Sequence, residues 1–187
     1  MDDEQFAALI ETMKKAAAAL RDAGIPFMLG GGLAAWARGG ARTEHDVDFL
    51  ILPADAEAAQ QALVDAGMKP ERPPEGWLLK AWDGEVLVDL IFEPTEGPIV
   101  PEQLERADEL NVMAMRMKVA RLEDVMSQKL LALKEQEPDF SQVIELARSL
   151  REQIDWDEVR GRTESSPLAK AFFTLVEELG ITPRAAA

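Results

Sequence analysis

Residues 27–52 read FMLGGGLAAWARGGARTEHDVDFLIL, and the rest of the chain is organised around this stretch. An apolar run ends in Gly30–Gly32, a short helical segment and a loop follow, and a second apolar run contains Asp46 and Asp48. Residues two apart in a strand point to the same face, so we expect both carboxylates to project together. Two unpaired charges on an apolar strand are costly unless a cation neutralises them. The stretch therefore predicts a site for a divalent metal, which prefers hard oxygen ligands.

A third acid in a later apolar segment supports this hypothesis. Asp89 lies inside residues 86–92, which read VLVDLIF. We expect two apolar strands that each carry acids to converge only around a cation. Three carboxylates suit one or two Mg²⁺ ions, whose coordination is completed by water and by substrate phosphates. The alternative is that Asp46 and Asp48 are an ordinary solvated feature of an edge strand.

The Gly30–Gly32 turn has more than one interpretation. Backbone N–H groups between a strand and a helix can approach a phosphate. Together with Ala35, the glycines also fit a G-x-G-x-x-A dinucleotide pattern. That pattern requires a full helix and an acid at the end of the second strand, whereas here the helix is broken at Gly39–Gly40 and the acids begin their strand. A tight turn with close packing is the remaining alternative.

The flanking segments predict a mixed sheet covered by helices. Helical spacing over residues 4–22 precedes the first strand, and a second long helix is expected over 54–66. Asp83-Gly84 between two apolar runs indicates a β-hairpin. Residues 93–101 are expected to form a loop, and 115–119 a last strand.

Every element expected after residue 121 is helical: 122–134, 139–150, a short piece near Trp156, and 167–179. We therefore expect an α/β (α+β) fold with a mixed, partly antiparallel sheet flanked by helices. Residues 1–120 would form the core, and residues 121–187 a helical C-terminal region packed on that core.

Composition constrains the location and the partners of the protein. The 187 residues carry a formal net charge of −15 and include no cysteine. Disulfides and thiolate metal sites are therefore excluded, and the charge argues against broad, sequence-independent binding of nucleic acid. The acidic start and the lack of a long apolar run differ from a signal peptide and a membrane span. These features predict a cytoplasmic protein without a membrane partner.

The motifs together resemble the nucleotidyltransferase superfamily of DNA polymerase beta type. The resemblance rests on Gly31-Gly32, a short helix, Arg42-Thr43, the Asp46-x-Asp48 triplet and the third acid Asp89. The chain is most similar to small bacterial members, including toxin-type enzymes related to the AbiEii family and minimal antibiotic-resistance-like enzymes. The core of the match covers residues 27–92. A looser similarity continues through 122–130, which contain Lys129.

The resemblance implies transfer of a nucleoside monophosphate from an NTP to a hydroxyl acceptor, with release of pyrophosphate. Asp46 and Asp48 would hold the Mg²⁺ that binds the triphosphate, and Asp89 would help to hold a second metal that activates the acceptor. Gly31 and Gly32 would cradle the β- and γ-phosphates.

Three further residues are candidates for binding the nucleotide. Arg42 and Thr43 either contact phosphate or only order the loop before the acids. Lys129 would contact the triphosphate according to the resemblance, whereas a lysine on an amphipathic helix is usually solvated. His45, the single histidine, is expected to be structural. Trp77 beside the hairpin is either a core aromatic or a base-stacking surface.

Two alternatives remain beside an active enzyme. One is a catalytically silent nucleotide- or partner-binding module of the same fold, and the other is a toxin–antitoxin component with a cognate antitoxin. The acceptor is open among a small molecule, RNA and protein. A cationic antibiotic such as an aminoglycoside would suit an acidic cleft. A tRNA end stays open because cations gather in the middle of the chain: Arg106, Arg116, Lys118, Arg121 and Lys129.

Overall fold

One sheet with the strand order β3-β4-β5-β2-β1-β7-β6 runs through the computed structural model, which describes residues 3–43, 46–136 and 138–182. Its seven strands, within those residues, are β1 Phe27–Leu29, β2 Asp46–Ile51, β3 Lys69–Glu71, β4 Leu78–Asp83, β5 Val86–Ile91, β6 Asp108–Val112 and β7 Met115–Val119. The pairs β2–β5 and β1–β7 are parallel, and the other neighbours are antiparallel. The predicted mixed, partly antiparallel sheet is confirmed.

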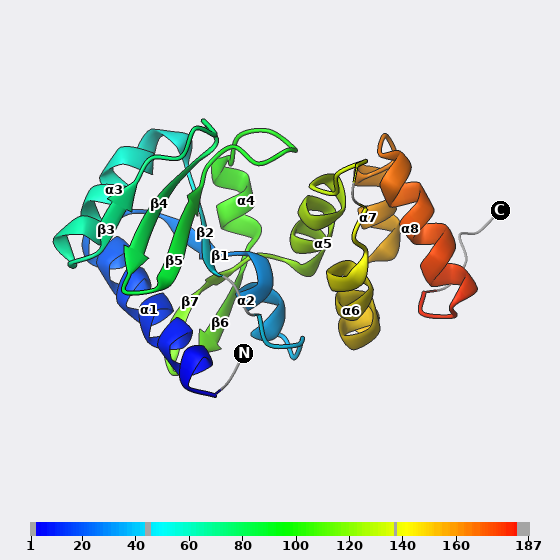
Figure 1. Cartoon of the computed structure of the whole chain (residues 1–187), viewed down its shortest axis with the longest axis horizontal. Helices are drawn as coiled ribbons and strands as arrows, with labels where there is room; N and C mark the ends of the chain where they lie inside the picture. The colour runs from blue at the N-terminus through cyan, green and yellow to red at the C-terminus, as the bar shows by residue number, and fades with distance from the viewer. Residues whose placement is uncertain (1–2, 44–45, 137, 183–187) are drawn as a thin grey trace.

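Two long helices, α1 (Asp3–Asp22) and α3 (Ala56–Asp65), cover one face of the sheet, as Figure 1 shows. The face of β2 toward them consists of Val47, Phe49 and Ile51, all with no exposed surface. Burying one such side chain contributes about 1.5–3 kcal/mol to folding. Because side chains alternate along a strand, the residues between them face the other side of the sheet. Packing against α1 thus directs the carboxylates of β2 to the opposite side of the sheet.

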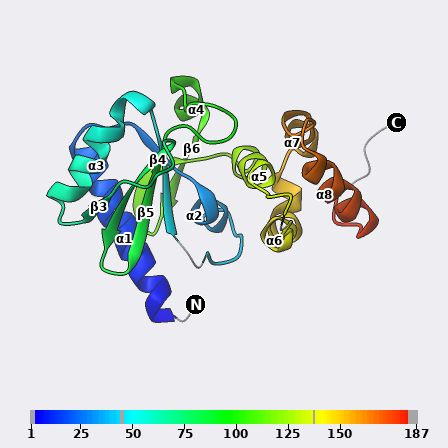
Figure 2. The same ribbon diagram turned by 45° about the horizontal axis from the view of Figure 1, so that its top comes forward.

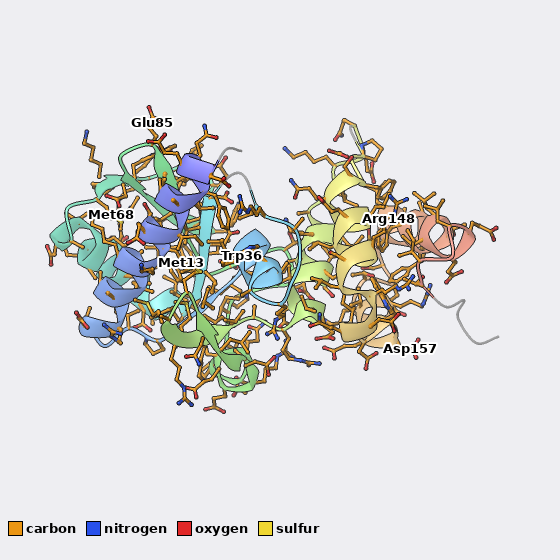
Figure 3. All side chains as sticks on the ribbon, turned by 90° about the horizontal axis from the view of Figure 1, so that it is seen from below. Met13, Trp36, Met68, Glu85, Arg148 and Asp157 are labelled. Atoms are coloured by element: carbon orange, nitrogen blue, oxygen red, sulfur yellow. The ribbon has the colours of Figure 1, made fainter. Side chains whose placement is uncertain are left out.

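The opposite side of the sheet carries α2 (Gly31–Trp36), which begins within the predicted glycine turn and contacts β2. Trp36 at the end of α2 packs edge-on against Phe6 of α1, with 5.1 Å between the ring centroids. Figure 3 shows Trp36 between Met13 of α1 and Arg148 of α6. Helix α2 therefore lies between the sheet and the helices of the C-terminal half.

The described residues between 122 and 178 include four α-helices: α5 Leu122–Leu131, α6 Ser141–Leu150, α7 Trp156–Arg162 and α8 Pro167–Glu178. Figures 1 and 2 show them to one side of the sheet, with α5 nearest to it. Trp156 and Phe172 each pack edge-on against Phe173, and these rings form part of a shared hydrophobic core. The helical C-terminal part is confirmed, while the domain boundary at residue 121 stays a prediction. Among the described helices, none is long and apolar enough to cross a membrane.

The structure contains two elements that the sequence pattern did not predict. Helix α4 (Pro101–Arg106) starts at the last residue of the expected loop, and Gln103 accepts a hydrogen bond from the N–H of Val100 (2.9 Å). Strand β6 then pairs with β7 through a turn in which Met113 and Ala114 have φ of 47° and 66°. Such two-residue turns usually contain Asn-Gly or a similar pair, so this hairpin had no recognisable sequence signal. Two short 3-10 helices, η1 (Pro53–Asp55) and η2 (Arg151–Gln153), complete the described secondary structure.

Candidate active site

Three carboxylates converge where β2 and β5 run side by side. The two strands pair in parallel with Asp48 opposite Asp89, and residues opposite each other project from the same face of a sheet. One ligand oxygen from each of Asp46, Asp48 and Asp89 lies within 4.8 Å of the other two. The structure therefore brings together the three acids that the sequence singled out, and their catalytic role stays a prediction.

Burial and mutual repulsion raise the proton affinity of this cluster. Loss of solvation, followed by the charges of Asp46 and Asp89, raises the pKa of Asp48 to about 8. Loss of solvation also raises the pKa of Asp89 to about 6, although the ammonium of Lys80 opposes this shift. A divalent cation favours the ionised form of a carboxylate and would reverse both shifts. The cluster has more negative charge than its own neighbours neutralise.

One buried oxygen of the cluster lacks a hydrogen-bond donor. Asp89 Oδ1 is buried and accepts no hydrogen bond from the described residues. The Nζ of Lys80, which is opposite Asp89 on β4, lies 3.5 Å away. Leaving a buried acceptor without a hydrogen bond costs about 1–3 kcal/mol. The hard oxygens of the three carboxylates fit a divalent cation such as Mg²⁺, and Asp89 Oδ1 is an oxygen that such an ion would satisfy.

The glycine turn is packed directly against Asp48. The N–H of Gly30 donates to the backbone carbonyl of Asp48 (2.8 Å). A Cβ built on Gly31, where φ is +51°, would lie 2.7 Å from Asp48 Cγ and closer still to Oδ2. A Cβ on Gly32 would lie 2.5 Å from Thr43 Cβ. Glycine is required here for close approach and, at Gly31, for its left-handed backbone. The turn thus makes room for a carboxylate, a need that the sequence analysis did not foresee.

A cavity of about 520 Å³ lies over the acids. Its lining includes the glycine turn and loop (Gly31, Gly32, Thr43), the strands and the segments beside them (Asp46, Asp48, Leu50, Trp77, Asp89, Ile91, Glu93, Pro94, Thr95) and the helices (Val125, Gln128, Lys129, Ala132, Gln142). A second cavity of about 290 Å³ shares Gly32, Thr43, Lys129 and Gln142 with the first. The two cavities therefore adjoin on the side of the glycine turn and α5.

The cationic candidates have different surroundings. Lys129 lines both cavities, donates to Gln142 Oε1 (3.0 Å), and its charge lowers the proton affinity of Asp48. Arg42 lines the second cavity, but its guanidinium donates to Asp3 (2.6 Å) and lies 4.7 Å from the ring centroid of Phe6. Arg42 thus orders the loop in this structure, and its contact with phosphate stays a prediction. His45 lies outside the described residues.

Trp77, for which the sequence left a core role and a base-stacking role open, is 42% exposed and lines the cavity. Its carbonyl accepts from the N–H of Glu93 (3.2 Å). Other lining residues were not predicted as site residues. Glu93 and Thr95 belong to the loop after β5. Their only signal was that this loop follows the strand with the third acid. Gln142 comes from α6, far away in the sequence, and had no recognisable signal.

The cations in the middle of the chain do not form a free basic surface. Arg106 pairs with Asp124, and Arg116 pairs with Glu109. Lys118 donates to the carbonyl of Leu104 (2.6 Å). Arg121 pairs with Glu123 and Glu158, both at 3.1 Å. Each of these four cations thus has a partner in the described structure, and a tRNA end as the acceptor stays a prediction.

A family model described as nucleotidyl transferase of unknown function (DUF2204) matches residues 9–172. The chain belongs to this family. The fold and the convergence of three acids agree with the predicted nucleotidyltransferase of DNA polymerase beta type, whereas the link to AbiEii-type toxins is not shown. No curated protein matches this nucleotidyl transferase in sequence.

Three solved structures share the fold of this nucleotidyl transferase. The solution structure of the antibiotic-resistance factor ANT(2'')-Ia has a TM-score of 0.67 and 14% identity, over 93% of this chain and 97% of that one. ANT(2'')-Ia in complex with adenylyl-2''-tobramycin has a TM-score of 0.65 and 14% identity, over 87% of this chain and 98% of that one. The lincosamide antibiotic adenylyltransferase LnuA, with lincomycin bound, has a TM-score of 0.51 and 17% identity, over 73% of this chain and 94% of that one. At such low identity these likenesses establish the fold alone.

Proposed function

We propose that this nucleotidyl transferase is Mg²⁺-dependent and transfers a nucleoside monophosphate from an NTP to a hydroxyl group of a small molecule. The observation that supports it most strongly is the cluster of Asp46, Asp48 and Asp89 within 4.8 Å, beside a cavity that Lys129 also lines. Phosphoryl transfer needs little covalent chemistry from a protein, because positioning and charge neutralisation supply most of the catalysis. Acids for metal binding and a lysine for phosphate meet that requirement.

Different residues have different roles in the proposed reaction. Asp46 and Asp48 would hold the metal of the triphosphate, with Gly31 and Gly32 beside the phosphates. Lys129 would offer its ammonium to them from α5. Bound Mg²⁺ supplies Lewis-acid neutralisation of the phosphoryl charge and lowers the pKa of a hydroxyl. A bond forms between the acceptor oxygen and the α-phosphorus, and the bond from that phosphorus to the bridging oxygen breaks. The hydroxyl proton passes to solvent water, and pyrophosphate departs.

Asp89 has a separate role in this proposal. Its raised pKa of about 6 results chiefly from burial, and Lys80 is its cationic neighbour. Asp89 would help to hold a second metal on the side where the acceptor hydroxyl arrives. Trp77, Glu93 and Thr95 line the cavity near the end of β5, so we assign the acceptor to this part of the lining.

A small acceptor is favoured over a polymer. A cavity of about 520 Å³ is within the range of sites for drug-sized molecules. The acids of the cavity favour an acceptor with a positive charge. The similar structures are of ANT(2'')-Ia with an adenylylated tobramycin and of LnuA with lincomycin. By analogy, we propose a hydroxylated small molecule for this chain, with ATP as one of the NTPs to test.

The alternatives to an active nucleotidyl transferase have less support. A catalytically silent binding module would not need all three acids, and the described structure keeps them together. A toxin–antitoxin role and an AbiEii-type relationship have no observation on this chain that favours them.

The proposal is tested by incubating the protein with Mg²⁺, each of the four NTPs labelled at the α-phosphate, and a cell extract or a panel of hydroxylated antibiotics. We expect one labelled small product together with pyrophosphate. Asp48→Asn should abolish labelling, whereas Asp22→Asn, the same change at an exposed position of α1, should not. Labelling by Asp48→Asn at the wild-type rate would rule out the proposed metal site. No labelling by the wild type would favour the binding module.

A further inference from the structure

Arg162, at the end of α7, forms the densest set of charged contacts next to the cavity. Its Nε and Nη2 donate to the two carboxylate oxygens of Glu96 (3.0 and 2.9 Å), and its Nη1 donates to Asp124 (2.7 Å). A weaker contact of 3.4 Å reaches Glu158. Two parallel charge-assisted bonds between one guanidinium and one carboxylate are strong and directional. Arg162 and Glu96 are also mostly buried, with 20% and 19% of their side chains exposed.

The two main partners of Arg162 lie next to residues that line the cavity from two different elements. Glu96 lies in the loop after β5, directly after Thr95, which lines the cavity. Asp124 lies in the first turn of α5, and the last turn of the same helix contributes Lys129. Arg162 is not among the lining residues. We call the lining residues of the loop after β5 the acceptor wall and those of α5 the triphosphate wall. Arg162 connects these two walls through Glu96 and Asp124.

The loop after β5 is held differently at its base and at its tip. At the base, the N–H of Ile99 donates to the carbonyl of Phe92 (2.8 Å), and Ile99 is buried. At the tip, the side chain of Glu96 bonds to Arg162. Among the described residues, no other side-chain hydrogen bond or ion pair anchors this tip. Loss of the Arg162 contact should release the tip and leave the base in place.

Helix α5, in contrast, keeps a second anchor. Asp124, with 2% of its side chain exposed, also pairs with Arg106 of α4. Removal of Arg162 therefore does not leave Asp124 as an unpaired buried charge, which would be strongly destabilising. The expected effect is local, at the loop, and global unfolding is not expected.

We infer that Arg162 is a positioning residue that fixes the loop of residues 93–97 against α5, so that the acceptor wall and the triphosphate wall of the cavity keep one separation. As a role in catalysis, this inference rests on the proposed function. The structural part of the inference, that Arg162 orders the loop, does not depend on the proposed function. A displacement of about 1 Å at a reacting group can lower the rate by on the order of 100-fold, so a loop held by one guanidinium is a sensitive element.

A matched control exists on the same helix. Arg160 pairs with Glu177 of α8 (2.6 Å) and lies 4.0 Å from the ring centroid of Phe173. These contacts connect α7 to α8 and involve no residue that lines the cavity. Arg160→Met thus removes an arginine with comparable contacts from α7 and leaves both walls of the cavity unaffected.

The experiment compares amide hydrogen exchange of the full-length chain and its variants. In Arg162→Met we expect exchange in residues 93–97 to rise by about tenfold or more, because bonds to a charged group are lost, with α8 unchanged. Arg160→Met should raise exchange in α8 and not in the loop. Arg162→Lys should be intermediate, because lysine cannot form the paired contact with Glu96. Equal exchange in the loop for wild type and Arg162→Met would overturn the inference.

A second measurement separates positioning from stability. Once the labelled acceptor is known, Arg162→Met should raise KM for the acceptor by about tenfold, whereas Arg160→Met should leave it within about twofold. Should Arg162→Met not fold, Glu96→Gln tests the same contact from the loop side. Unchanged KM together with a released loop would overturn the catalytic role. If the wild type transfers no label at all, the proposed function fails while the exchange result still decides the structural role.

Discussion

Replacing Gly31 with alanine tests the geometry of the site most directly. The new Cβ would lie 2.7 Å from Asp48 Cγ, and an ordinary contact begins at 3.4 Å, so that carbon must retreat by about 0.7 Å. The carboxylate oxygens must move further, because Oδ2 is the nearest atom to the new methyl group. A shift of about 1 Å at a reacting group lowers the rate by on the order of 100-fold. We expect a loss of that size in the rate of nucleotidyl transfer.

The same substitution also has a cost in backbone energy, which a second glycine measures by itself. Gly31 has φ of +51°, and an alanine in this region costs about 1–2 kcal/mol. Gly24 has φ of +72°, and a Cβ there would meet nothing within 4 Å. Gly24→Ala should therefore lower the free energy of unfolding by a similar amount and leave the site intact. The difference between the two variants isolates the contact with Asp48.

The assay measures transfer of label at several Mg²⁺ concentrations and the free energy of unfolding by urea. Gly31→Ala should lose activity and need more Mg²⁺, whereas Gly24→Ala should keep both at wild-type values. If the two variants have equal activity, Asp48 does not act from the position that the structure gives it, and the assignment of the metal site is wrong.

Four further outcomes are expected. The metal-free protein should lose stability as the pH rises from about 4 to about 8, because the pKa of Asp48 (about 8) and that of Asp89 (about 6) lie above the unfolded value of 3.8. Thermal melts should show that Asp48→Asn removes much of this loss of stability. An equal loss of stability in Asp48→Asn would contradict the prediction. Chelation of Mg²⁺ by EDTA should stop transfer, and added Mg²⁺ should restore it; transfer that persists in EDTA would refute the metal requirement. Lys129→Met should raise KM for the NTP by on the order of tenfold, while Lys170→Met on α8 serves as the control and should not. Phe49→Ala, which removes a side chain with no exposed surface, should lower the free energy of unfolding by about 3–5 kcal/mol; a change below 1 kcal/mol in urea denaturation would show that the packing is wrong.

The acids were predictable because their chemistry conflicts with their surroundings. Asp48 and Asp89 sit inside apolar strands, and such a conflict needs a cation to resolve it. Strand alternation then fixed the side of the sheet to which Asp46 and Asp48 point. The parallel register that places Asp48 opposite Asp89 could not be read in advance, since it depends on which strands become neighbours.

The remainder of the site depends on tertiary contacts without local signals. Gln142 reaches the cavity because α6 packs beside α5, and nothing in its own segment marks it. Arg42 lies before the acids as expected, yet its pairing with Asp3 depends on where α1 begins. The β6–β7 hairpin was missed because Met113 and Ala114 adopt positive φ, which tertiary context imposes against their preference.

The parallel pairing of β2 with β5 also has a consequence for synthesis of the chain. During synthesis, β2 emerges with Asp46 and Asp48, and Asp89 follows only when the β4–β5 hairpin has been made. No shorter N-terminal fragment contains all three acids, so a nascent chain cannot assemble the complete cluster before this hairpin joins the sheet. Lys129, on α5, arrives later still. Under the proposed function, the chain would therefore become able to bind a metal–nucleotide complex only late in its synthesis, when most of the sheet is in place.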